Sequence, residues 1–282
     1  MPTPRAALHS LAIGTLVAGT AIAARAAAAE RVVAIPTRAD VTVHAIVIDQ
    51  APADAPVVVL LMGGDGVMGL GGWDGRGHPS GNFLVRSRAL FAREGLNVVV
   101  PDAPSDVVEG HGGSLRGFRT SSRYAADMKA ILDVMRARAR TGPAFLVGTS
   151  RGTIGAVGAA ARLPADVLAG IVLTATVTRP NRRRTQATVH NAELAAIRVP
   201  VLLAHHEEDA CLVTPAGDVG ALANAFTAAP SVKTLLYRGG GPFTGDDCGA
   251  RAAHGFPGLE ERVVGDIARW IKAIAGSGPA PR

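Results

Sequence analysis

The stretch "AFLVGTSRGTIGAVGAA", residues 144–160, decides the fold of this chain. It opens with apolar residues, reaches Gly148, and places Ser150 and Arg151 before a second glycine, Gly152. The apolar run predicts a buried strand, and the small residues after it predict a helix packed closely against that strand. Ser150 therefore stands at a strand-to-helix turn, either as a nucleophile or only as the N-cap of the helix.

Strands and helices alternate through the rest of the chain. Residues 31–37 and 41–48 predict an opening β-hairpin, because the second segment alternates in polarity. Apolar runs predict buried strands over 55–62, 96–104, 144–148, 168–176, 199–206 and 231–237. Helical spacing predicts helices over 83–94, 123–140, 151–163 and 258–276. This order predicts an α/β fold with a mostly parallel, about eight-stranded sheet and helices on both faces.

The first 29 residues have the organisation of a secretory signal peptide. Arg5 precedes an apolar run over 11–24, and a tail of small residues ends at Ala29. The alternative is an uncleaved membrane anchor, but the run is short for a span and Arg25 follows it at once. We expect a signal peptide over 1–29, a single domain over 30–282, and a periplasmic or secreted protein without a stable membrane anchor.

Composition and charge exclude several classes of protein. The formal net charge is +6, and loss of Arg5 and Arg25 with the signal lowers it to +4. The sequence has no basic stripe with interleaved aromatic residues, so we do not expect nucleic-acid binding. His205 and His206 are adjacent, which is poor geometry for joint ligation of a metal on one strand, so we expect neither a metal nor a cofactor. The sequence does not predict the oligomeric state.

Ser150 lies in a G-x-S-x-G motif between a strand and a helix, which is the setting of a serine nucleophile. A serine hydroxyl needs a base to take its proton, and the partners are expected in the order serine, acid, histidine. His254 directly precedes the last helix and is the favoured base over His205 and His206. Asp209, at the end of the penultimate strand, is the favoured acid, with Glu208 as its main competitor.

Two further features surround this predicted triad. Cys211 follows the predicted acid by two residues, and Cys248 precedes the predicted base by six, so a disulfide between them would join the two loops. The alternatives are two unrelated buried thiols, or a bond that only staples the fold. The glycine-rich segment 63–72 predicts an oxyanion hole whose backbone donors are Gly64 or Asp65, together with the amide of Arg151.

These motifs resemble the α/β-hydrolase superfamily. The resemblance rests on "LLMGGDG" at the oxyanion strand, "GTSRG" at the turn, "HHEEDACLVTP" at the acid and "HGFPGLE" at the histidine. It implies Ser150 as nucleophile, Asp209 as acid and His254 as base, acting on an ester or related acyl bond of a small molecule. One departure is Gly63-Gly64, where many members have His-Gly.

Other functions use the same residues. A peptidase, amidase or lactonase would carry the same triad, and a non-catalytic binding protein could keep the same fold. The segment "GGDG" also resembles the loop with which lipid and NAD kinases hold nucleotide phosphates. Among basic residues, Arg86, Arg88, Arg119 and Arg123 are candidates for a carboxylate clamp, with surface charge or an ion pair as the favoured role of each. Loops 63–82 and 176–192 are long, and the second is placed to cover a site.

Overall fold

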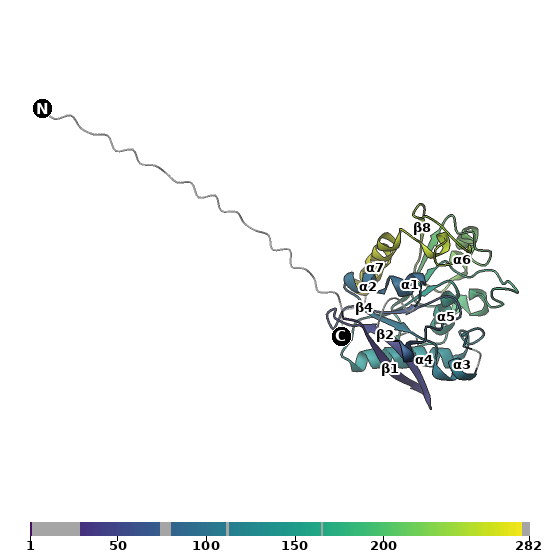
Figure 1. Cartoon of the computed structure of the whole chain (residues 1–282), viewed down its shortest axis with the longest axis horizontal. Helices are drawn as coiled ribbons and strands as arrows, with labels where there is room; N and C mark the ends of the chain where they lie inside the picture. Colours follow the sequence, from purple (N-terminus) through teal and green to yellow (C-terminus); the bar gives the residue numbers. More distant parts are fainter. Residues whose placement is uncertain (2–28, 74–79, 111–112, 165, 278–282) are drawn as a thin grey trace.

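The computed structural model describes residues 1, 29–73, 80–110, 113–164 and 166–277 (Figure 1). The predicted signal peptide therefore lies almost entirely outside the described residues. Eight strands form one sheet in the order β1-β2-β4-β3-β5-β6-β7-β8. They are β1 (Arg31–Arg38), β2 (Val41–Ile48), β3 (Val57–Leu61), β4 (Asn97–Pro101), β5 (Ala144–Thr149), β6 (Gly170–Thr174), β7 (Val201–His206) and β8 (Val232–Tyr237).

The sheet is antiparallel at one edge and parallel elsewhere. β1 and β2 form the predicted hairpin, and β2 also runs antiparallel to β4. The other neighbouring strands, in the sheet order β4-β3-β5-β6-β7-β8, are all parallel to one another. The carboxyl ends of these strands therefore share one edge, where loops from different parts of the chain meet. The predicted α/β fold is confirmed.

Both faces of the sheet are covered by apolar side chains. In β3, Val57 and Val59 pack into one core, whereas Val58 and Leu60 pack into the other. The first core receives α4 (Ser122–Ala137), α5 (Arg151–Ala160) and α6 (Val219–Ala225). The second receives α1 (Phe83–Arg86), α2 (Arg88–Arg93) and α7 (Glu260–Gly276), and Figure 1 shows α2 and α7 across the sheet from α4. A strand buried on two faces has to be apolar throughout, which explains the continuous runs in the sequence.

Three helical features differ from the prediction. The helix expected over 83–94 is two short helices, α1 and α2, with Ser87 between them. Two helices were not predicted, namely α3 (Ser105–Gly110) and α6. Both are short, and α6 is built from glycine, alanine and asparagine beside only two large apolar residues, so its helical periodicity is weak.

Within the described part of the chain, no helix combines the length and the apolar character that a membrane crossing requires.

Candidate active site

Ser150 occupies the turn between β5 and α5 in a backbone conformation that non-glycine residues rarely adopt. Its φ is 51° and its ψ is −127°. An ordinary N-cap residue has extended backbone, and its side chain accepts a hydrogen bond from the first turn of the helix. Ser150 has neither property, since its side chain makes no capping hydrogen bond. Ser150 thus stands at the N-cap position of α5 without capping the helix through its side chain, and its strained turn is of the kind found at functional sites.

Glycines around Ser150 allow three backbone segments to converge. A Cβ atom at Gly63 would lie 2.8 Å from the Cβ of Ser150, and one at Gly152 would lie 2.0 Å from the carbonyl oxygen of Leu61. A Cβ at Gly148 would lie 2.6 Å from the carbonyl oxygen of Gly152. Any side chain at these positions would push the turn, the helix and β3 apart. The close packing brings the loop after β3 directly against the serine.

His254 and Asp209 form a buried pair at the same edge of the sheet. Asp209 follows β7, and His254 lies in the short helix η5 (Ala253–Gly255) after β8. Nδ1 of His254 is 3.0 Å from Oδ2 of Asp209. The two residues are 5% and 6% exposed, so water competes little for this contact. The structure thus brings together the residues that were predicted as base and acid.

Asp209 is held as an ionised acceptor. Oδ1 accepts a hydrogen bond of 3.0 Å from the amide of Cys211, and Oδ2 accepts one of 2.9 Å from Oγ1 of Thr214. Burial opposes ionisation, but hydrogen bonds from His205 and His254 outweigh it and hold the pKa of Asp209 well below its ordinary value. A carboxylate only accepts hydrogen bonds, so the proton in the contact with His254 sits on Nδ1. With its proton on Nδ1, the ring of His254 leaves Nε2 as the nitrogen that can accept a hydrogen bond.

Two residues support this pair, and one of them was not predicted. Oγ1 of Thr214 lies 3.1 Å from Nδ1 of His254 as well as 2.9 Å from Asp209, so it touches both partners. Nε2 of His205 lies 2.8 Å from the carbonyl oxygen of Thr214 and 3.4 Å from Oδ2 of Asp209, so the carbonyl is its main acceptor. Thr214 stands in the acid loop before a proline, a position with no distinctive sequence signature.

Apart from His205, the side chains of the other candidate acids and bases make no contact with this pair among the hydrogen bonds and ion pairs of the described residues. Glu208 is exposed, whereas Glu207 pairs with Arg238. Nε2 of His206 lies 2.9 Å from the carbonyl oxygen of Gly239. Among the hydrogen bonds of the described residues, none joins the hydroxyl of Ser150 to the ring of His254. Such contacts are often long in enzymes without substrate.

The loop after β3 is held against the turn by two arginines. Gly64 has a φ of +60°, and Nη2 of Arg119 donates to the carbonyl oxygens of Met62 at 3.3 Å and Gly64 at 3.1 Å. Nη1 of Arg151 lies 2.9 Å from Oδ1 of Asp65. Arg119 thus holds two carbonyl groups of this loop, and the Arg151–Asp65 ion pair links the loop to the first residue of α5.

Cys211 and Cys248, which are 37 positions apart in the sequence, are joined by a disulfide in the structure. The bond connects the loop of Asp209 to the segment that leads into His254. The ligand atoms of Asp209, Cys211 and His254 lie within 4.8 Å of one another, a spacing that suits a metal ion. The sulfur of Cys211 is engaged in the disulfide and offers no thiolate, so this set lacks one of its three ligands.

The arginines that were considered for a carboxylate clamp divide into two groups. Three of them have acidic partners: Arg86 lies 2.9 Å from Glu260, Arg88 lies 2.7 Å from Glu30, and Arg123 lies 3.8 Å from Asp106. Arg119 differs, because no carboxylate among the described residues pairs with it and it is only 3% exposed.

The parallel sheet, the strained serine turn and the buried aspartate–histidine pair at one sheet edge are those of an α/β hydrolase. The sequence model of a family described as "Serine aminopeptidase, S33" matches residues 74–214. This match spans half of the chain, and the chain belongs to this family of α/β hydrolases. The loop "GGDG" is therefore the loop after β3 of a hydrolase, and the kinase alternative is wrong.

Solved structures share this fold at low sequence identity. Est1E from Butyrivibrio proteoclasticus has a TM-score of 0.57 and 14% identity, over 87% of this chain and 99% of that one. An esterase from Pyrococcus furiosus has a TM-score of 0.61 and 14% identity, over 88% of this chain and 92% of that one. A puromycin-hydrolyzing peptidase from Mycobacterium tuberculosis has a TM-score of 0.63 and 17% identity, over 93% of this chain and 42% of that one. No curated protein sequence matches the chain.

Proposed function

We propose that this hydrolase is a serine esterase in which Ser150 is the nucleophile, His254 the base and Asp209 the acid. The observation that carries the proposal is the buried hydrogen bond of 3.0 Å between Asp209 and His254. It lies at the sheet edge where Ser150 follows β5 with a strained backbone. A buried carboxylate that holds the histidine tautomer is what serine hydrolysis needs, because the imidazole then accepts the serine proton at Nε2.

The reaction follows from these positions. Oγ of Ser150 attacks the ester carbonyl carbon while Nε2 of His254 takes its proton, and Asp209 stabilises the resulting imidazolium. The amide of Arg151 and that of Gly64 or Asp65 donate to the oxyanion. The imidazolium then protonates the departing alkoxide, which leaves an acyl-serine. Water, deprotonated by His254, attacks the acyl-serine and releases the acid together with the regenerated enzyme.

An ester is favoured over an amide or a lactone as the default substrate of this triad. The structural neighbours include both esterases and peptidases, so the fold alone separates neither class. A chain-length series of 4-nitrophenyl esters, compared with aminoacyl 4-nitroanilides and γ-lactones, tests the choice. Faster turnover of a short or medium ester supports it, whereas turnover of anilides or lactones alone contradicts it.

We further propose that the protein is exported, with a signal peptide over 1–29 and a single catalytic domain over 30–282. The basic, apolar and small-residue order of the N-terminus supports this, as does a disulfide, which persists in oxidising compartments. Sequencing of the mature protein from a bacterial periplasm should begin at Glu30. A chain recovered only in the cytoplasm with Met1 retained would contradict export.

The disulfide is expected to support both stability and turnover. Reduction frees the loop of Asp209 from the segment before His254, and opening a loop of this length removes about 4 kcal/mol of unfolding free energy. We expect dithiothreitol to lower the melting temperature and, at temperatures where the reduced protein stays folded, to lower kcat/KM for an ester several-fold.

The Cys248→Ala variant is the matched control for reduction. It should behave like the reduced wild-type protein and should not respond to dithiothreitol. A lower melting temperature with unchanged kcat/KM would show that the bond staples the fold without positioning the acid and the base.

A further inference from the structure

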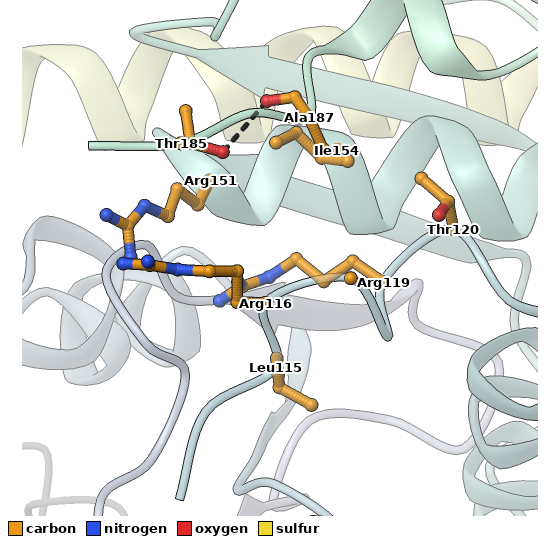
Figure 2. Close-up of a pocket in the computed structure, with 9 residues that line it drawn as sticks. Leu115, Arg116, Arg119, Thr120, Arg151, Ile154, Thr185 and Ala187 are labelled. Carbon is orange, nitrogen blue, oxygen red and sulfur yellow. Dashed lines mark hydrogen bonds between the residues drawn. The ribbon is translucent and has the colours of Figure 1, made fainter. Parts of the chain in front are cut away.

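A small cationic pocket lies beside the proposed nucleophile. Three arginine side chains, Arg116, Arg119 and Arg151, extend toward the same region (Figure 2). They come from the segment before α4 and from the first residue of α5. Thr185 and Ala187, from the long loop after β6, close the pocket on another side. The loop that was predicted to cover a site therefore lines this one.

Arg119 is the buried member of the group. Its guanidinium makes hydrogen bonds to two backbone carbonyls, and its Nε atom is buried with no hydrogen-bond partner among the described residues. Burial, with the charge of Arg151 adding to it, lowers the pKa of Arg119 to about 10, so the side chain is still cationic at neutral pH. A buried cation without an acidic partner is costly, unless a ligand supplies the negative charge.

The other two arginines leave the pocket with excess positive charge. Arg151 pairs with Asp65, whose side chain is 59% exposed and so neutralises it weakly. Arg116 is exposed, and no ion pair of the described residues includes it. Within the part of the chain that the structure describes, these three guanidinium groups have one carboxylate partner, Asp65.

The pocket is close to the bond that would be cut. Arg151 follows Ser150 directly, and Arg119 holds the carbonyls of Met62 and Gly64 on either side of the glycine that touches the serine. An anionic group bound by these arginines would therefore belong to the same substrate molecule as the ester. Leu115 and Ile154 also line the pocket, whose volume of about 10 Å³ admits a group no larger than a water molecule, so only the end of a carboxylate would enter it.

We propose that this pocket binds a carboxylate of the substrate, so that the preferred esters carry a free carboxylate near the scissile bond. The proposal rests on the esterase function given above. The planar fork of a guanidinium matches a carboxylate in two parallel hydrogen bonds, and the exposed Arg116 is free to close over it. The carboxylate can belong to the acyl part or to the alcohol part of the ester, and the substrates below distinguish the two.

The test compares esters that differ only in charge. Monomethyl adipate and methyl 5-carbamoylpentanoate carry the group on the acyl side, and 4-acetoxybutanoate and 4-acetoxybutanamide carry it on the alcohol side. We expect kcat/KM to be at least about tenfold higher for the carboxylate in one of these pairs, since a charge-assisted hydrogen bond is worth about a factor of ten. This ratio should fall as NaCl is raised from 10 mM to 500 mM.

Arg116→Gln is the decisive variant, because it removes an exposed side chain that makes no ion pair among the described residues. It should lower the carboxylate-to-amide ratio about five- to tenfold, chiefly through KM. Arg93→Gln is the matched control: it removes the same charge from α2, where the side chain is 64% exposed, and should leave the ratio unchanged. Ratios near one in both pairs, or an equal effect of the two variants, would overturn the proposal.

A binding measurement separates this proposal from the esterase function. Calorimetry should detect monomethyl adipate or 4-acetoxybutanoate binding to the Ser150→Ala protein more tightly than its amide, and Arg116→Gln should remove the difference. Selective binding without ester cleavage by the wild type would keep the anion pocket and refute the esterase. Cleavage of neutral esters without selective binding would keep the esterase and refute the pocket.

Discussion

Ester hydrolysis by the Ser150→Ala protein should fall by about 10⁵-fold in kcat, to the level that binding and backbone donors alone provide. The alanine keeps the Cβ that packs against Gly63 and removes only the hydroxyl, which makes no capping hydrogen bond to the helix. The expected loss is therefore chemical rather than structural. Kinetics on the best 4-nitrophenyl ester, with circular dichroism and the melting temperature as checks of folding, measure it.

His254→Ala provides the matched comparison. Triad residues act as a unit, so it should lose about as much as Ser150→Ala, and the double variant should lose little more than either. Fully additive losses would indicate that the two residues act in separate steps. Retention of more than a tenth of wild-type activity by either single variant would contradict the proposed roles.

Asp209→Asn should lower kcat by about 10³- to 10⁴-fold. An asparagine has almost the same shape, but it removes the negative charge and can present an N–H group to Nδ1 of His254. The ring is then driven toward the tautomer that carries its proton on Nε2, which cannot accept the proton of Ser150. Thr214 would keep its place beside the pair, so the packing of the loop should survive.

Glu208→Gln is the control for this substitution, since it makes the same chemical change one residue earlier on an exposed side chain. It should retain wild-type kcat and KM. A large loss in Glu208→Gln together with normal activity in Asp209→Asn would assign the acid to Glu208.

The melting temperature of the wild type should fall on acidification. The pKa of Asp209 is lower in the folded than in the unfolded protein, so this carboxylate stabilises the fold only while it is ionised.

Most of the fold could be predicted because the parallel strands are buried on both faces. Val57 through Leu61 and Val98 through Val100 form unbroken apolar runs, which a two-sided core requires. The turn at Ser150 could be predicted because close contact forces glycine at Gly148 and Gly152. The short helix α6 could not, because its small residues carry little periodic signal and its position depends on packing against the sheet.

The supporting residues were harder to predict than the proposed triad. Thr214 touches both His254 and Asp209 only because the acid loop folds back on itself, and a threonine before a proline has no distinctive signature. Arg119 was one candidate of four in the sequence. Only the three-dimensional structure separates a buried arginine that pairs with no carboxylate of the described residues from arginines in ion pairs. The spacing of residues along the sequence does not show which arginine pairs with an acid from a distant part of the chain.

The cationic pocket also bears on the proposed chemistry. Arg119 and Arg151 lie next to the loop that would hold the oxyanion, and Arg119 is buried there. Positive charge there favours the developing negative charge of the transition state. Substrate recognition and oxyanion stabilisation would thus share a loop, which is why the exposed Arg116, and not Arg119, is the residue to vary in tests of selectivity.

Covalent labelling tests the nucleophile most directly. The wild-type protein is treated with a fluorophosphonate and digested, and the modified peptide is sequenced by mass spectrometry. We predict a single phosphonylated residue at Ser150, with labelling strongly slowed in the His254→Ala protein. Folded wild-type protein that remains unlabelled while it cleaves esters, or that carries the label at another serine, would contradict the proposed mechanism.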